Sequence, residues 1–338
     1  MGLTLFITVI LKEGLIMIKS GNKITVPFWV IVNKEISDIV RSWRFLIMLG
    51  LIVLTCMGSL YTALDDFTKA ITASDPEDTF FFLKLFTHTD GTLPSFIVFI
   101  SFLGPLLGIS MGFDSINSEQ NNGTLSRLLA QPIFRDYLLN AKFTAALIVL
   151  STLFFALGLL VLGFGLIFIG IPPTAEEFMR IVVFSLVNII YVAFWLNLAI
   201  LFSVKFRQAA TSALAGISIW LFFSIFFSMI INLIAKGLKP SVFVSENHVV
   251  AFQRFIQNIM RINPGQLFND ATTSLLMPTV RSLGPLTTEQ MSGAIPSPLP
   301  LGQSLMLVWP QATVLIAGTI VFFAIAYTLF MCREIRSR

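Results

Sequence analysis

The chain has 338 residues, of which 56% are hydrophobic and 12% are charged. A soluble globular domain carries about 25% charged residues, so this composition excludes an ordinary soluble fold and predicts a protein that buries apolar surface in lipid. The net charge of +4 is small and is not gathered into a block of Lys and Arg, so we expect no nucleic-acid partner.

The N-terminal segment 1–44 is expected to lie in the cytoplasm. Its first sixteen residues lack the positive region and the cleavage site of a signal peptide, and Met17 is an alternative start. Pro27 can open a helix in which apolar residues from Val32 to Trp43 recur on one face, with polar residues opposite. We therefore predict an amphipathic helix on the inner membrane surface.

Six apolar stretches are long enough to cross a bilayer. At about 1.5 Å rise per residue, each helix would span a hydrocarbon core of about 30 Å. The stretches lack the alternation of barrel strands, and an open sheet would leave backbone groups unpaired in lipid. The sequence thus predicts an all-α integral membrane protein. The stretches are Phe45–Leu64, Leu93–Phe113, Phe143–Ile171, Ile181–Val204, Ala209–Ala235 and Val308–Met331.

Lys and Arg are concentrated in alternate connections, which predicts the orientation of the chain. The segments before the first span, between the second and third, between the fourth and fifth, and after the last hold fourteen of them. The connections 65–92 and 172–180 hold three, against eight Asp and Glu. Both termini are therefore expected in the cytoplasm, with the chain in the cytoplasmic (inner or plasma) membrane.

The long connection 236–307 is external by parity. Apolar residues between Phe252 and Met260 share one helix face, so we expect an amphipathic helix that rests on the outer leaflet, dips into it, or packs on its own loop. Further on, Pro296, Pro298 and Pro300 predict an extended segment. The expected units are 1–44, the first five spans at 45–235, the external loop at 236–307, and the last span with its tail at 308–338.

The sequence offers no constellation of residues for catalysis. His88 and His248 are its only histidines, and neither has the spacing of a metal ligand. It has no phosphate-binding loop of the Walker type. The six spans contain no ionisable residue, whereas ion-coupled carriers keep one inside the bundle. We therefore expect no catalytic, metal or cofactor site on this chain.

Small residues at the start of the fifth span predict a close helix contact. Ala209 with Ala213, and Ser212 with Gly216, have the small-xxx-small spacing that lets two helices approach. The spacing leaves open whether the partner helix belongs to this chain or to a second subunit.

The connection 114–142, between the second and third spans, carries the most informative pattern. After a turn at Gly123, Thr124 can cap a short helix with an apolar leucine face, and Pro132 can end it. From spacing alone, a helical hairpin with a solvated tip explains the pattern equally well.

This connection resembles the signature of the ABC transporter type 2 permease family. The six spans, the amphipathic helix ending at Trp43 and the long outer segment are similar as well. Gln120, Phe134 and Ala141 depart from the family pattern, which bears on docking geometry. The matching residues are Glu119, Gly123, Thr124, Leu125, Leu128, Leu129, Pro132, Ile133, Arg135 and Lys142.

The resemblance implies the permease subunit of an ATP-driven exporter, with two permeases and two separate ATPase subunits that bind ATP and Mg²⁺. In that family this segment docks on the ATPase. Glu119 and Arg135 would be polar contacts, Gly123 the turn, and Leu125, Leu128 and Leu129 the apolar docking face. Lipids, hydrophobic peptides and drugs would suit the apolar bundle equally. A channel or energy-independent carrier, or a membrane-embedded enzyme or scaffold, remains as an alternative.

Overall fold

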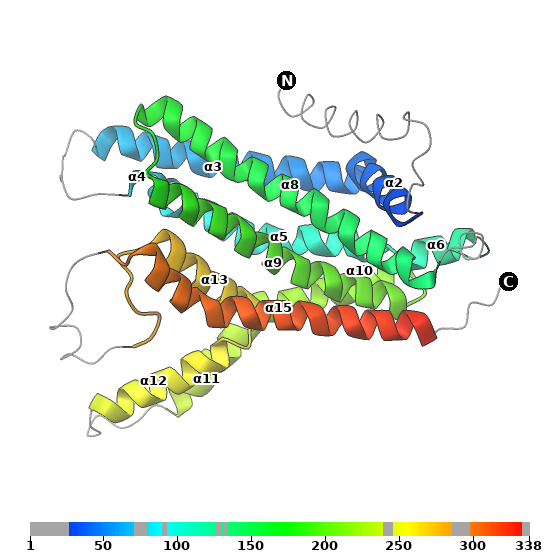
Figure 1. The fold of residues 1–338 in the computed structure, drawn as a ribbon. Helices are drawn as coiled ribbons and strands as arrows, with labels where there is room; N and C mark the ends of the chain where they lie inside the picture. The colour runs from blue at the N-terminus through cyan, green and yellow to red at the C-terminus, as the bar shows by residue number, and fades with distance from the viewer. Residues whose placement is uncertain are drawn as a thin grey trace.

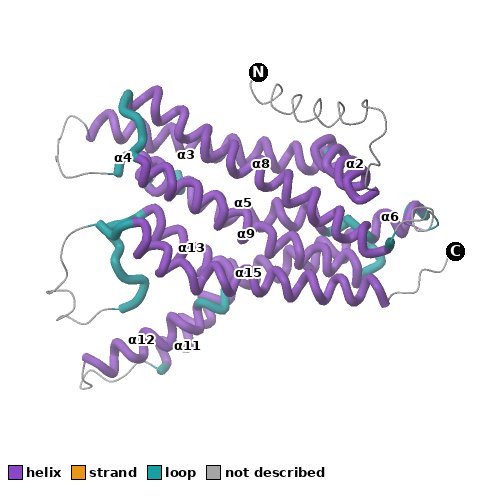
Figure 2. Tube along the Cα trace, viewed as in Figure 1, coloured by secondary structure: helices purple, strands orange, loops and turns teal. Residues whose placement is uncertain are grey.

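The structure, a computed structural model, describes residues 27–70, 80–89, 93–125, 130, 134–238, 246–285 and 298–332. Throughout these described residues the regular elements are helices, and six of them are long and apolar enough to cross a membrane (Figures 1 and 2). The predicted all-α membrane class with six spans is confirmed.

The membrane-spanning helices extend past their apolar cores. Apolar runs mark only the part that lipid can cover, whereas backbone hydrogen bonding continues until a cap ends it. In the fourth span, for example, a capping box of Thr174 and Glu177 starts the helix well before the predicted Ile181. The helices are α3 (Trp43–Ala70), α5 (Phe96–Gly112), α8 (Arg135–Ile169), α9 (Ala175–Lys205), the continuous α10 (Ala209–Leu221), η2 (Phe222–Phe227) and α11 (Ser228–Gly237), and α15 (Leu301–Cys332).

Within the described residues, five further helices lie between or beside the spans. The two expected amphipathic helices are formed, as α2 (Pro27–Arg41) and α12 (Glu246–Met260). Three others were not predicted: α4 (Phe81–Thr87), α6 (Asn117–Asn121) and α13 (Pro264–Leu276). The first two are too short to show a helical period. Figure 1 shows α6 at one end of the bundle and α4 at the other, and we call these the α6 end and the α4 end.

Helix α9 is the centre of the bundle, with α5, α8, α10, α13 and α15 packed around it. Two glycines of α5 allow the closest of these contacts. A Cβ atom at Gly108 would lie 2.7 Å from the carbonyl oxygen of Val192, and one at Gly112 would lie 2.7 Å from that of Leu196. Since both neighbours are backbone atoms, neither could move aside easily.

The pair of helices α12 and α13 enters the layer of spans from the α4 end. Its joint carries Asn263, whose side chain donates to the carbonyl of Phe223, at the middle of the fifth span. Phe268 of α13 stacks on Tyr191, at the middle of α9, with ring centroids 4.3 Å apart. The joint of α12 and α13 thus lies beside the middle of two spans, and the placement of α12 relative to the outer leaflet stays a prediction.

A buried arginine connects several elements at the α4 end. Arg180 of α9, which the sequence pattern assigned to a loop, is fully buried and pairs with Glu176 at 2.8 Å. Its guanidinium also donates to the carbonyls of Leu275 (2.9 Å) and Leu299 (2.6 Å) and to Ser304 Oγ (3.1 Å). One side chain thus ties α9 to α13, to the segment before α15 and to α15 itself.

Candidate functional site at the α6 end

The site begins with the packing of α2 along α8. Val32 of α2 is fully buried against Ala141 and Ala145 of α8, and Ile36 and Ile39 extend this contact. The two alanines bring the helix axes close together, because they add little bulk between them. Burying a valine contributes about 1.5–3 kcal/mol, so this face alone is a substantial anchor for α2.

Lys142, the next residue of α8, joins three helices. Its ammonium lies 2.9 Å from Glu35 Oε2 of α2 and 2.8 Å from Glu119 Oε1 of α6. The Lys142 side chain is only 7% exposed. Lys34 completes the cluster, because its ammonium lies 2.9 Å from Glu35 Oε1 and 3.8 Å from Glu119 Oε1. We call Lys34, Glu35, Glu119 and Lys142 the charge cluster.

Within the charge cluster, ion pairing shifts the pKa values of Glu35 and Lys34 in favour of their charged forms. Burial alone would raise the pKa of Glu35, but Lys142 and then Lys34 outweigh it and hold this pKa below its usual value. For Lys34, partial burial opposes the charge, while Glu35 and Asp38 raise the pKa above its usual value. A buried ammonium costs several kcal/mol unless it is paired, so the two carboxylates are what allows Lys142 to lie here.

The α6 segment is held from two further sides. Ser203 Oγ of α9 accepts hydrogen bonds from the backbone N–H groups of Ile116 (2.9 Å) and Asn117 (3.2 Å). Arg44, at the start of α3, pairs with Asp114 just before α6. Together with Lys142, these contacts attach α6 to α2, α3, α8 and α9. A displacement of α6 would therefore change its contacts with all four helices.

Comparison with known proteins identifies the family. The ABC-2 family transporter protein model matches residues 29–335. The chain belongs to the ABC-2 transporter family. The "Probable ABC transporter permease protein NosY" of Pseudomonas aeruginosa is 25% identical over 191 residues, which are 54% of this chain and 63% of that protein. The protein of the same name from Stutzerimonas stutzeri is 28% identical over 156 residues, 43% of this chain and 53% of its own length. The chain thus matches less than two thirds of the length of each relative.

The family signature is distributed between the charge cluster and the turn beside it. Glu119 and Lys142, which the sequence pattern separates by a whole connection, form an ion pair inside the chain. This pair gives Glu119 an intramolecular role beside the predicted contact to an ATPase. Gly123 has φ +68°, in the left-handed region that favours glycine, at the predicted turn. Thr124 donates its hydroxyl to the carbonyl of Glu119 at 3.1 Å.

The predicted docking residues are only partly described. Leu125 is buried in the main apolar core, so its side chain supports the turn from within the chain. Arg135 begins α8 and lies over the ring of Phe330, with 5.8 Å from Cζ to the centroid. Leu128, Leu129 and Pro132 lie outside the described residues. Docking on an ATPase therefore stays a prediction for all these positions.

The small residues of the fifth span face two environments. Ser212 and Gly216 are buried, and Gly216 lies against Ile109 of α5. Ala209 and Ala213 are half-buried. One small pair therefore packs within this chain, and a contact between two permeases stays a prediction.

Sequence reasoning missed Glu35, Asp114 and Ser203 as parts of this site. The first could have been found from its position, because Glu35 lies three residues after Val32 and four before Ile39, within the apolar stripe of α2. A charge in such a stripe needs a buried partner. The other two carry no local signal, since their partners are far away in the sequence.

Proposed function

We propose that this chain is the permease subunit of an ATP-driven ABC exporter whose ATPase is a separate polypeptide. Family membership supports a transport component of this class. The observation that carries the coupling mechanism is the Glu119–Lys142 pair, which links the signature turn to α2 through Glu35. In this proposal both termini lie in the cytoplasm, two permeases meet two ATPases, and ATP with Mg²⁺ binds to the ATPases.

The charge cluster would pass on the movement of the ATPase. Docking at the turn beyond Gly123 would push or pull α6, and the buried ion pairs would carry that displacement to α2 and α8 as a rigid-body motion. Apolar packing alone would let α6 slide, whereas Lys142 can satisfy both carboxylates only in one relative placement of three helices. This is the reason to place the coupling in the cluster.

The substrate is expected to be apolar or amphiphilic. None of the described side chains in the predicted core of a span carries a charge, and the spans are rich in Phe and Leu. Lipids, hydrophobic peptides and drugs all fit this lining, and export is the direction that the family resemblance implies.

Capture of the ATPase tests the proposal. The purified chain alone should hydrolyse no ATP, and it should retain an ABC ATPase encoded beside its gene. Replacing Leu128 and Leu129 by Ser removes about 1.5–3 kcal/mol of apolar burial for each leucine that docks, so capture should weaken at least tenfold. Leu238→Ser, at an exposed leucine beyond α11, is the matched control. Unchanged capture by a normally folded double variant would reject the docking site.

A further inference from the structure

The fifth span changes direction at its midpoint. The segment Phe222–Phe227 is a π-helix, a widened turn of the kind that bends helices and recurs at functional sites. Before it, α10 buries Ser212, Gly216 and Trp220 in the bundle. After it, no residue of α11 is buried. Figure 1 shows α11 and α12 leaving the bundle together beside α15, and we call this pair the arm.

The Asn263 amide connects the bend to α13, beside the packing of Phe223 on the main apolar core. Asn263 Nδ2 donates to the carbonyl of Phe223 at 2.8 Å, and Asn263 Oδ1 accepts from the backbone N–H of Gly265 at 2.9 Å. The second bond caps the N-terminus of α13, where Pro264 occupies the first turn. These two partners fix which way the amide faces, since a carbonyl needs a donor and an N–H needs an acceptor.

The helix that carries Asn263 is itself firmly placed. Phe268 stacks on Tyr191, and the Tyr191 hydroxyl donates to the carbonyl of Ser101 at 3.1 Å. At the other end of α13, the carbonyl of Leu275 accepts from Arg180. The amide therefore reaches the bend from a platform built on α9 and α5.

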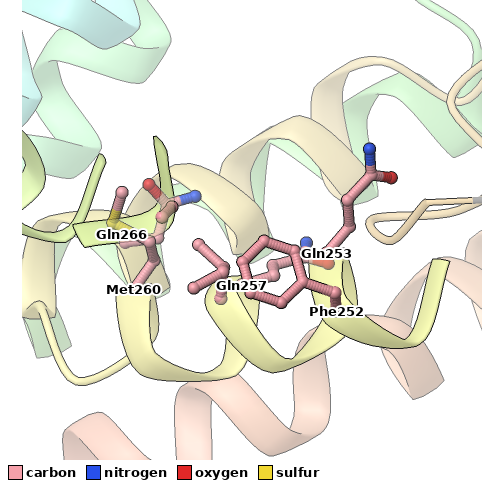
Figure 3. A pocket seen from close by; sticks show the side chains of 7 residues that line it. Phe252, Gln253, Gln257, Met260 and Gln266 are labelled. Atoms are coloured by element: carbon pink, nitrogen blue, oxygen red, sulfur yellow. The ribbon is translucent and has the colours of Figure 1, made fainter. Parts of the chain in front are cut away.

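An open groove lies beside the joint of α12 and α13. Its volume is about 300 Å³, and it is lined by Ala235 of α11, by residues of α12 such as Ile256, and by Gln266 of α13 (Figure 3). Because this space is open, the arm has room to change its angle relative to α13.

We infer that Phe222–Phe227 is the hinge of the fifth span and that Asn263 is the positioning residue that sets the angle of the arm. The bond to Phe223 holds the widened turn against α13, and we expect the arm to swing when that bond is absent because no residue of α11 is buried. The inference concerns this chain alone, so it stands or falls separately from the ATPase partnership.

Distance measurements between two spin labels test the inference. The full-length chain, with Cys56→Ala and Cys332→Ser, receives nitroxides at Leu233→Cys of the arm and Leu159→Cys of α8, both exposed positions. The distance distribution is measured by pulsed electron paramagnetic resonance in lipid nanodiscs. With Asn263 present, one narrow distribution is expected.

Two substitutions separate the hinge bond from the cap. Asn263→Ser keeps an N-cap of similar quality but is too short to reach Phe223, whereas Asn263→Ala loses both bonds. We expect a second or broader population in both variants and none in Asn258→Ser, the matched change at an exposed Asn of α12. A changed distance distribution in Asn263→Ala alone would assign the effect to the cap. An unchanged distribution in both variants would show that Asn263 does not set the angle of the arm. Either result overturns the inference.

Discussion

Lys142 and Glu35 lie 107 positions apart in the sequence, yet their charged atoms meet at 2.9 Å in a buried contact between α8 and α2. Glu119 shares the same ammonium from α6. Because one lysine serves two carboxylates, the three helices cannot shift independently without separating buried charges.

Removal of the Lys142 charge should destabilise the chain strongly. Lys142→Met removes the buried partner of Glu35 and Glu119 and leaves them only the half-exposed Lys34, and breaking a buried pair costs about 3–5 kcal/mol. Thermal unfolding in detergent should show a lower midpoint. The triple variant Lys142→Met, Glu35→Gln, Glu119→Gln should recover most of the loss, because no unpaired charge remains. Lys205→Met, at an exposed lysine, should change little. Equal midpoints for Lys142→Met and Lys205→Met would contradict the buried cluster.

The contact between α2 and α8 should loosen only in acid. The pKa of Glu35 lies below its usual value in the folded chain, so its contribution is fully present above the unfolded pKa of about 4.3. That contribution is lost as the pH falls through the lower, folded pKa. Spin labels at Trp29→Cys and Leu159→Cys should report a constant distance from pH 5 to neutrality and a change below about pH 4. Glu35→Gln should lack this transition. A transition of the same size in that variant would assign the pH dependence to other groups.

The close contact of α5 with α9 should not tolerate a methyl group. Gly108→Ala brings Cβ to 2.7 Å from the carbonyl oxygen of Val192, and overpacking of this kind costs about 1–3 kcal/mol. Gly163→Ala in α8 is the matched control, since nothing lies within 4 Å of its Cβ and Ala favours the helix. The unfolding midpoint should fall for the first variant and hold or rise for the second. The reverse order would rule out the backbone contact.

The guanidinium fork of Arg180 should be irreplaceable by lysine. Its donors serve one carboxylate, two carbonyls and a hydroxyl in four places, which three N–H groups on a flexible stem cannot reach together. Arg180→Lys should therefore speed hydrogen exchange in α13 and at the start of α15, measured by mass spectrometry. Arg254→Lys, on the exposed face of α12, should leave exchange there unchanged. Normal exchange in Arg180→Lys would show that the fork does not hold α13.

The spans could be predicted from the sequence because lipid imposes a long apolar run on each of them. Helix α13 could not, since it begins with Pro264 and Gly265, which are typical of a loop, although Asn263 and Pro264 are a recognisable start signal. Only those site residues that belong to the family signature could be predicted from the sequence. Glu119 and Lys142 were found in this way, but their mutual contact was not, because it depends on how three helices are packed.

Two residues are buried where the sequence pattern predicted exposure, and their roles differ accordingly. Arg180 follows the pattern of a loop charge, yet the structure extends α9 around it and supplies an acceptor for each of its groups. Leu125 belongs to a leucine face by spacing, yet it packs inward. Sequence spacing predicts which residues share a helix face. It does not predict which other element packs on that face, because this depends on tertiary contacts.

We propose that an ATPase drives this chain through the charge cluster, and ATP hydrolysis in the reconstituted complex can show whether it does. ATP turnover by the ATPase is measured alone, with the unmodified chain, and with the triple variant Lys142→Met, Glu35→Gln, Glu119→Gln, after confirming that both chains fold and capture the ATPase. We predict that the unmodified chain changes the hydrolysis rate and that the triple variant binds without changing it. If the folded triple variant regulates hydrolysis as the unmodified chain does, coupling does not pass through the charge cluster.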